Sequence, residues 1–317
     1  MPRILLIKTS SLGDVVHNLP VLADIAAARP DVTIDWVVEE AFAAIPRLHP
    51  RVSQVLPVAM RRWRRALWNP AVWGEVRAFI RNLRDQHYDA VIDTQGLLKS
   101  AWIAAAARGM SHGLDWQSSR EPLGFFYDRR HHVPWGQHAV ERNRQLAAQA
   151  LGYTLSAPAQ YGIAAATQSF TWLDPSRPHA VLLHATSADR KLWPEERWIE
   201  LGKTLAAQGI SSVLPWGTAA EHERSLRLAQ QIAQAVVPER LELSLLAALL
   251  AQARVVVGTD TGLTHLAGAL GVPTVGIYCA TDPAATGLHA CARGVNLGGV
   301  GKPPAVAEVM AALALIR

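Results

Sequence analysis

Short apolar runs rich in β-branched residues alternate along this chain with longer Ala- and Leu-rich stretches of helical period. Parallel strands need a crossover of a dozen or more residues between them, and stretches of this kind supply it. The alternation therefore predicts an α/β protein with helices covering parallel sheets. Because the pattern occurs twice, we expect two Rossmann-like domains whose sheets face each other across a central cleft.

The expected elements place the domain boundary. In the first half we expect strands at residues 3–7, 33–38, 52–58 and 89–93, and helices at 72–86, 100–107 and 138–151. In the second half we expect strands at 179–184, 210–216, 253–258 and 273–278, and helices at 195–208, 219–234, 243–251, 263–270 and 305–316. The stretch between the halves loses periodicity and carries three prolines. The predicted domains are residues 1–155 and 179–317, joined by a linker at 156–178.

Composition limits the classes of protein that remain. Half of the 317 residues are apolar, which is enough for two cores, and no apolar run approaches the roughly 20 residues of a membrane-spanning helix. A strand stands where the apolar core of a signal peptide would lie, so we expect a cytoplasmic protein. Cys279 and Cys291 are interpreted as reduced structural residues. The net charge of +5 favours an anionic partner, which could be a nucleic acid, an anionic lipid or a phosphorylated small molecule.

The stretch "VVVGTDTGLTHLAGALGVPTVGIY" at residues 255–278 carries the densest set of candidate site residues. A strand runs into Asp260, Thr261 and Gly262, and a helix follows. The backbone N–H groups of Thr261 and Gly262 would stand at the positive end of that helix, which suits a pyrophosphate. An ordinary helix cap is the alternative, but His265, one turn further on, favours a ligand site.

Two further loops in the second half follow strands in the same way. "LLHATSADRKLWPEERW" offers the hydroxyls of Thr186 and Ser187 and the ammonium of Lys191 to phosphate oxygens. "LPWGTAAEHER" offers Glu221, whose carboxylate could take both hydroxyls of a ribose. The alternatives are an ordinary loop with a surface lysine and an exposed glutamate at a helix start.

In the first half, "TSSLGDVVHN" places Asp14 at the start of a helix, where the helix dipole favours its ionised form. An ionised carboxylate at the edge of a cleft could act as a general base. A helix-capping aspartate is the alternative, and this stretch alone favours the cap.

The segment "MRRWRRALW" holds four arginines in five residues around a tryptophan. Charge runs usually mark a solvated face, but this density exceeds what solubility requires. Arginine beside tryptophan suits either a membrane interface or stacking on nucleic-acid bases. Lys99 in "QGLLKS" and Arg120 in "DWQSSREPL" add to this basic character.

The common nucleotide-binding fingerprints are missing from the sequence. "GKT" at residues 202–204 lacks the first glycine of a Walker loop, and Gly-x-Gly-x-x-Gly does not occur. There is also no Asp-x-Asp pair that would hold a divalent metal against a nucleotide diphosphate. The glycine-rich "GVNLGGVG" at residues 294–301 is predicted to be a surface loop.

Taken together, these motifs resemble a known family. "KTSSLGDVVHNLP", "DWVVEE", "RRWRR", "DTQGLLKS", "HGLDWQSSREPL", "HAVER", "DRKLWPEE", "LPWG" and "TDTGLTHLAGAL" are similar, in this order, to the lipopolysaccharide heptosyltransferases of glycosyltransferase family 9, type I above all. The resemblance extends from Arg3 to about Asp282. It departs from the family pattern at Cys279-Ala280, where Gly-Pro is commoner, and we expect no site residue in that loop.

The resemblance implies a GT-B enzyme, with the acceptor on the first domain and the donor on the second. It would transfer heptose with inversion from ADP-L-glycero-β-D-manno-heptose to the inner Kdo of Kdo2-lipid A. It would need no metal or other cofactor and would act peripherally on the cytoplasmic face of the bacterial inner membrane, without a nucleic-acid partner. In GT-B proteins the C-terminal helix often packs back on the first domain.

The resemblance also assigns residues. Asp14 would be the catalytic base, and Lys191 would neutralise the departing diphosphate. The donor would contact Thr186, Ser187, Lys191, Glu221, Leu241, Asp260, Thr261, Gly262 and His265. The acceptor would contact Ser10, Ser11, Gly13, Arg61, Arg62, Arg64, Lys99 and Arg120, because arginine suits bidentate binding of phosphate and carboxylate.

Two alternatives remain open from sequence. The second heptosyltransferase of the same pathway uses an acceptor that already bears heptose, although "SSLGDVVHNLP" and "DWQSSREPL" favour the first. A non-enzymatic nucleic-acid-binding protein that uses "RRWRR" would bind with strong salt dependence and would be indifferent to Asp14→Ala.

Overall fold

The computed structural model describes residues 1–316 and divides into two compact units, Met1–Ile163 and the chain from Ala164 onward. Each unit is built on one sheet in which every strand pairing is parallel. This confirms the predicted α/β class with two Rossmann-like sheets. The division between Ile163 and Ala164 lies within residues 156–178, which contain no helix or strand.

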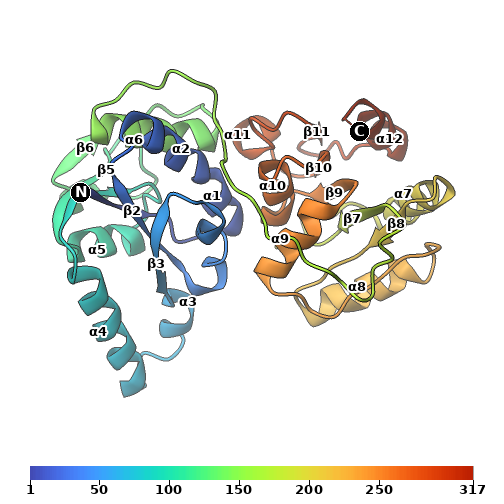
Figure 1. The fold of residues 1–317 in the computed structure, drawn as a ribbon, viewed down its shortest axis with the longest axis horizontal. Coiled ribbons are helices and arrows are strands. Elements are labelled where there is room, and N and C mark those ends of the chain that lie inside the picture. The colour runs from blue at the N-terminus through green and yellow to red at the C-terminus, as the bar shows by residue number, and fades with distance from the viewer. Residues whose placement is uncertain (317) are drawn as a thin grey trace. The chain divides into compact units, whose positions relative to one another are not determined.

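The first unit holds a six-stranded sheet of order β3-β2-β1-β4-β5-β6 (Figure 1). Its strands are β1 (Arg3–Ile7), β2 (Thr33–Glu39), β3 (Val52–Val58), β4 (Tyr88–Asp93), β5 (Gly109–Leu114) and β6 (Arg129–His131). Its helices are α1 (Leu12–His17), α2 (Leu19–Ala28), α3 (Met60–Trp63), α4 (Pro70–Arg84), α5 (Leu98–Ala106) and α6 (Ala139–Leu151), with 3₁₀ turns η1 (Glu40–Phe42), η2 (Pro46–Leu48) and η3 (Gly124–Phe126).

Helices cover both faces of this sheet because its central strands are apolar on both sides. Leu5 and Ile7 of β1 join a core with Phe79 of α4 and Ile103 of α5. Side chains alternate along a strand, so the equally buried Leu6 faces the opposite layer. That layer contains α2 and α6, which pack side by side (Figure 1).

The second unit holds a five-stranded sheet of order β11-β10-β9-β7-β8. Its strands are β7 (His179–Leu183), β8 (Ser211–Val213), β9 (Val255–Thr259), β10 (Thr274–Tyr278) and β11 (Gly294–Gly298). Its helices are α7 (Glu195–Ala207), α8 (Ala219–Ala229), α9 (Leu243–Gln252), α10 (Gly262–Ala269), α11 (Pro283–Thr286) and α12 (Val306–Ile316), with the 3₁₀ turn η4 (Asp189–Lys191).

The core on one face of the second sheet contains side chains of α7, α8 and α12. It also contains the perpendicular rings of Trp193, which precedes α7, and Trp198 of α7. Four residues of α12, from Val306 to Leu313, belong to this core, which anchors the C-terminal helix in the second unit. Helices α9 and α10 pack together, and α10 also contacts β9 and β10.

One predicted element is wrong. Residues 294–298 of the glycine-rich segment form strand β11 and not a surface loop, with Thr274 of β10 opposite Gly294. The side chain of Asn296 accepts from Leu288 N and donates to Leu288 O, both at 2.9 Å. The strand therefore owes its place to long-range partners rather than to its own composition. No helix among residues 1–316 is both long and apolar enough to span a bilayer.

Candidate functional site

The predicted acceptor residues of the first unit all follow carboxyl ends of strands. Ser10, Ser11, Gly13 and Asp14 follow β1, the arginines at 61–64 follow β3, Lys99 follows β4 and Arg120 follows β5. Because the strands are parallel, these ends share one edge of the sheet, which is where α/β folds bind ligands.

Asp14 occupies the third position of α1 and closes a capping box with Ser11. Its Oδ2 atom accepts from Ser11 N at 2.6 Å and from Ser11 Oγ at 2.9 Å. The capping role considered from sequence is therefore present. One carboxylate oxygen serves the cap, and the residue is only half-buried. A cap and a catalytic base are compatible in this geometry, since Oδ1 makes neither of these two bonds.

Lys99 lies within electrostatic range of Asp14 and of two arginines of the basic segment. Lys99 donates from Nζ to Ser10 Oγ at 2.5 Å. The pKa of Lys99 is lowered, chiefly by burial and further by the charges of Arg61 and Arg64, while Asp14 and Glu39 oppose the shift. The structure therefore brings Asp14, Lys99, Arg61 and Arg64 together at this edge.

Two charged residues of this edge, Lys8 and Arg142, were not predicted from the sequence. Lys8 is buried, and its Nζ donates to Thr94 O at 2.7 Å and to Asn143 Oδ1 at 3.2 Å. Burial lowers the pKa of Lys8, Asp14 raises it, and the charges of Arg120 and Arg142 lower it further. Arg120 and Arg142 thus belong to the same electrostatic neighbourhood. Lys8 is the first residue of "KTSSLGDVVHNLP" and could have been suspected from its position after a buried strand.

The middle of "RRWRR" is engaged within the first unit. Arg62 forms ion pairs with Glu40 and Glu75, at 3.1 and 2.8 Å. Trp63 is buried in the core and donates from its indole N–H to Glu75 Oε2 at 2.7 Å. Trp63 therefore offers no exposed ring for stacking on bases. Arg64 and Arg65 are exposed.

The predicted donor residues of the second unit also follow strand ends. Thr186, Ser187 and Lys191 follow β7, Glu221 follows β8 and begins α8, and Asp260 to His265 follow β9. Leu241 is half-buried in the loop before α9, and Ser187 is exposed. These strands are neighbours in the sheet, so their loops lie at the same edge.

Asp260 is the centre of this group. Its Oδ2 accepts from Lys191 Nζ and from Thr281 Oγ1, both at 2.7 Å, and its Oδ1 lies 3.5 Å from His265 Nε2. Burial raises the pKa of this carboxyl, but the bonds from His265, Lys191 and Thr281 outweigh it and hold the pKa well below 3.8. Asp260 is therefore ionised at neutral pH.

The same group includes Thr186, which donates to Asp260 O at 3.2 Å. Thr281 was not predicted, because it lies in the loop where the sequence departs from the family pattern. A hydroxyl after the end of β10 was the available signal. The structure thus joins residues from the ends of three neighbouring strands, β7, β9 and β10, around one carboxylate.

The turn from β9 into α10 is tightly packed. Thr261 is the N-cap of α10, with Gly262 as the first helical residue, and Thr264 Oγ1 donates back to Thr259 O at 2.7 Å. A Cβ at Gly258 would lie 2.1 Å from Thr264 Oγ1, so only glycine fits. The start of an eight-residue helix therefore stands immediately beside Asp260, with its dipole favouring an anion.

Glu221 forms a capping box with Thr218 at the start of α8. Its Oε2 accepts from Gly217 N at 2.7 Å and from Thr218 N at 3.1 Å. The alternative considered from the sequence, a glutamate at a helix start, is thus part of its role. Oε1 takes part in neither of these cap bonds.

Among residues 1–316 there is no group of three or more His, Cys, Asp or Glu side chains arranged to hold a metal ion. The polar groups at the donor edge are a carboxylate, an ammonium, hydroxyls, an imidazole and a helix start. This set can hold a diphosphate by charge and hydrogen bonds.

Comparison with known proteins gives a consistent result. The family model for glycosyltransferase family 9 (heptosyltransferase) matches residues 76–308. The chain is 50% identical over 299 residues to lipopolysaccharide heptosyltransferase 1 of Pseudomonas aeruginosa, covering 93% of this chain and 83% of that one. It is 48% identical to the Escherichia coli K12 protein of the same name, covering 90% of each. It is 27% identical to E. coli lipopolysaccharide heptosyltransferase 2, covering 89% of this chain and 84% of that one.

Solved structures of heptosyltransferases also match this chain closely. E. coli heptosyltransferase WaaC with ADP superposes with a TM-score of 0.91 at 41% identity, covering 99% of this chain and 100% of that one. The same enzyme with ADP-2-deoxy-2-fluoro heptose gives a TM-score of 0.87 at 42% identity, covering 99% of each chain.

Proposed function

The chain belongs to glycosyltransferase family 9, the heptosyltransferase family, and we propose that it transfers L-glycero-D-manno-heptose from ADP-heptose to the inner Kdo of Kdo2-lipid A. It is a glycosyltransferase with the GT-B fold that transfers heptose in synthesis of the lipopolysaccharide inner core. The acceptor, the inversion at the anomeric carbon, the metal independence and the role of each residue are the parts that we propose.

The observation that carries the acceptor assignment is the position of Lys99 at the carboxyl edge of the first sheet, within electrostatic range of Asp14, Glu39, Arg61 and Arg64. A sugar acid attached to phosphorylated lipid A is polyanionic, and this edge offers it several cations beside Asp14. Asp14 would take the proton from the attacking Kdo hydroxyl as the new glycosidic bond forms. The first unit would therefore bind the acceptor.

The second unit would bind the donor. Lys191 and the N–H groups of Thr261 and Gly262 would contact the diphosphate, and the bond from the anomeric carbon to its oxygen would break as ADP leaves. The developing negative charge would be offset by Lys191, which a carboxylate already holds in place. Glu221 would hold the ribose, Leu241 would pack against adenine, and Thr186, Ser187, Asp260 and His265 would complete the donor site.

The second heptosyltransferase of the pathway is the nearest competing function. The greater identity to relatives with the first activity favours the first, as do the motifs around Asp14 and Arg120. The nucleic-acid-binding alternative is disfavoured because Arg62 and Trp63 are engaged with Glu40 and Glu75.

We also propose that the enzyme acts peripherally at an anionic membrane surface on the cytoplasmic side. The segment between α3 and α4 exposes Leu67 at 51% and Trp68 at 82% of their surface, and Trp73 at the start of α4 is 48% exposed. Exposed Arg64 and Arg65 precede them directly. Tryptophan and leucine beside arginine suit the boundary between lipid headgroups and acyl chains.

One assay tests the reaction. The purified protein is incubated with ADP-heptose and either Kdo2-lipid A or its mono-heptosylated form, with EDTA present, and the products are weighed by mass spectrometry. We expect one heptose on Kdo2-lipid A and no addition to the heptosylated form. Turnover of the heptosylated form alone would assign the second activity, and loss of turnover in EDTA would refute metal independence.

A further inference from the structure

Gln95 follows the carboxyl end of β4 and reaches across to the loop after β1. Its Oε1 accepts from Thr9 N and from Ser10 N, both at 3.1 Å. Strands β1 and β4 are neighbours in the sheet, so the loops after them leave the same edge side by side. One side chain therefore holds the start of the segment that carries Ser11 and Asp14.

The backbone of Gln95 is held in turn by Asp93. Asp93 Oδ1 accepts from Gln95 N at 2.9 Å and from Gly96 N at 3.2 Å. Its Oδ2 accepts from the Tyr127 hydroxyl at 2.7 Å, and Asp93 is fully buried. Gly96 has a φ of +64°, a left-handed conformation that glycine adopts without strain. Both ends of the Gln95 side chain are thus held before any acceptor binds.

These bonds decide which way the Gln95 amide points. Two backbone N–H groups need an acceptor, so the amide oxygen faces Thr9 and Ser10 and the nitrogen faces away from them. Nε2 has no hydrogen-bond partner among residues 1–316. The residue is half-buried, and Nε2 is not one of the polar atoms that the fold encloses without a partner. Its two N–H groups are therefore open to a ligand.

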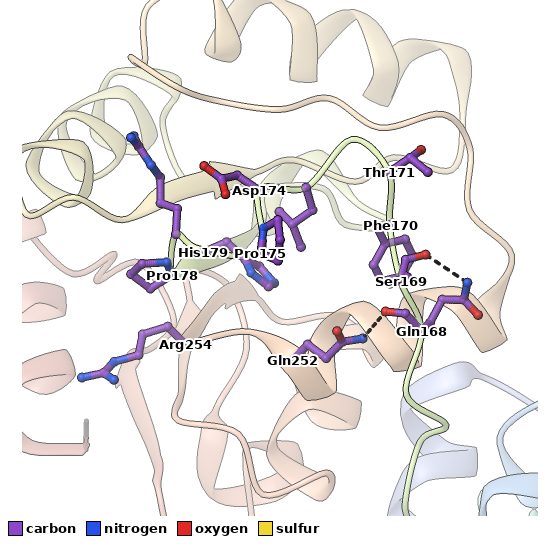
Figure 2. Close-up of a pocket in the computed structure, with 12 residues that line it drawn as sticks. Gln168, Ser169, Phe170, Thr171, Asp174, Pro175, Pro178, His179, Gln252 and Arg254 are labelled. Carbon is purple, nitrogen blue, oxygen red and sulfur yellow. Dashed lines mark hydrogen bonds between the residues drawn. The ribbon is translucent and has the colours of Figure 1, made fainter.

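Two glutamines of the second unit differ in this respect. Gln252 and Gln168 line a cavity at the amino ends of β7 and β9 (Figure 2). Gln252 Nε2 donates to Gln168 O and to Ala248 O, both at 3.0 Å. Gln168 Nε2 donates to Ser169 O, also at 3.0 Å. These nitrogens hold backbone carbonyls in place, whereas the nitrogen of Gln95 has no such task.

The Lys99 ammonium lies close to the Gln95 amide. Lys99 Nζ donates to Ser10 Oγ at 2.5 Å, and Gln95 accepts from the backbone N–H of the same serine. An ammonium beside an open amide N–H offers two donors to one carboxylate. The next residue, Ser11, is bound by Asp14. The ring of a sugar acid carries its carboxylate and its hydroxyls on one small frame, so it can meet both groups at once.

We propose that Gln95 is a further acceptor-binding residue, whose Nε2 donates to the carboxylate of the sugar acid while its Oε1 holds the loop that leads to Asp14. The carboxylate accepts from Gln95 and Lys99, and a hydroxyl of the same ring donates to Asp14. The neutral amide supplies this contact without placing a second charge beside the base. This contact rests on the proposed transfer to a sugar acid.

Gln95→Glu separates the two roles of the side chain. It keeps an oxygen for Thr9 and Ser10 but replaces the donor nitrogen with a second carboxylate oxygen. KM for Kdo2-lipid A should rise at least about tenfold, as expected for loss of a hydrogen bond to a charged group, with kcat and ADP affinity changed much less. Gln86→Glu is the matched control, because it adds the same charge before β4, at the amino edge, where the side chain accepts from Arg3. It should behave like the parent protein.

Gln95→Met separates the lost donor from the added charge. Methionine has a similar length and no charge, but it binds neither the loop nor the acceptor. KM should again rise, and kcat should fall as well, because Thr9 and Ser10 lose the acceptor for their N–H groups and the segment with Asp14 loosens. A KM at the parent value in either Gln95→Glu or Gln95→Met would overturn the contact.

A measurement on the parent protein serves where a variant does not fold. The side-chain amide resonances of Gln95 in ¹H–¹⁵N spectra should shift when a water-soluble, deacylated Kdo2-lipid A is added at a concentration that saturates transfer. Those of Gln86 should stay in place. No transfer by the parent protein would refute the proposed function, whereas transfer by the parent with an unmoved Gln95 amide would refute this contact alone.

Discussion

Lys191 Nζ lies 2.7 Å from Asp260 Oδ2, so the ammonium predicted to meet the donor diphosphate is held by a buried carboxylate. The pair fixes the lysine before any donor arrives, and it keeps Asp260 ionised. Preorganised charge of this kind is more effective at a leaving group than a flexible side chain.

Lys191→Ala should weaken ADP-heptose binding and lower kcat together, the latter by about 10²-fold. Lys203→Ala is the matched control, because it removes an exposed lysine on α7. Donor affinity by titration and single-turnover rates give the two readings separately. An unchanged donor affinity would remove Lys191 from the diphosphate site.

The same substitution should change the acid sensitivity of the fold. The folded pKa of Asp260 lies below 3.8, so its ionised form stabilises the protein above that pH, and this stabilisation is lost as the pH falls towards the folded pKa. Without Lys191 the folded pKa rises, and the advantage of the ionised form shrinks. Urea unfolding from pH 7 to 3 should show Lys191→Ala losing less stability on acidification, measured from its own lower value at pH 7. Parallel curves for the two proteins would contradict this.

Asp14→Asn should abolish most transfer while preserving the start of α1. The amide keeps an oxygen for the bonds from Ser11, whereas the general base is lost, at a cost of about 10² to 10⁴ in kcat. Ser11→Ala is the control, since it removes one cap partner and leaves the carboxylate. Near-normal turnover in Asp14→Asn with unchanged melting would refute the assignment of the base.

Glu221→Gln should weaken ADP binding by roughly tenfold, because a charged acceptor for the ribose hydroxyls becomes neutral. Its amide oxygen can still accept from Gly217 and Thr218, so stability should change little. Thr218→Ala tests the cap alone and should cost about 1 kcal/mol of stability with normal ADP affinity. If Thr218→Ala weakened ADP equally, Glu221 would act only through the loop.

Lys99→Ala should raise KM for Kdo2-lipid A more than Arg62→Ala does. Lys99 donates a hydrogen bond to Ser10 and interacts electrostatically with Asp14, whereas Arg62 already forms ion pairs with Glu40 and Glu75. Initial rates against acceptor concentration measure the difference. The reverse order would move the acceptor site towards α3.

Trp68→Ala should reduce binding to vesicles that contain anionic lipid, with catalysis on a water-soluble acceptor unchanged. Trp135, 47% exposed and stacked on Arg142, provides a control tryptophan. Sedimentation with vesicles of increasing anionic content measures the effect. Equal losses in Trp68→Ala and Trp135→Ala would argue against the segment between α3 and α4 as the contact surface.

Local patterns predicted much of this fold. The strands Arg3–Ile7 and Val52–Val58 were placed to the residue, because buried β-branched runs between turns are distinctive. Strand β8 is shorter than predicted: Leu214 N donates to Val236 O, and Pro215 has no N–H to continue the ladder with β7. Strand β11 was missed because its glycines carry little strand propensity.

The candidate site could be predicted only where residues and spacing carry the signal. Asp260, Thr261 and His265 follow one strand and were found together, whereas Thr281 comes from the next strand, and sequence does not show that its hydroxyl reaches Asp260. Lys8 was overlooked because a buried lysine depends on partners such as Asn143, 135 residues away. Glu39 was overlooked for the same reason, because Arg61 N donates to its side chain only in the folded unit.

Glycine at position 258 has no side chain beyond its Cα, and this close packing limits which sequence changes the second unit can accept. Because β9 touches Thr264 there, strand and helix start cannot separate or slide without moving Asp260, and Asp260 carries Lys191, Thr281 and His265 with it. A single insertion or deletion between Thr259 and Gly262 would therefore displace groups from three loops at once. Changes in donor preference should accumulate instead in the loop around Ser187 and in that around Leu241, where one contact can change while the rest stay in register.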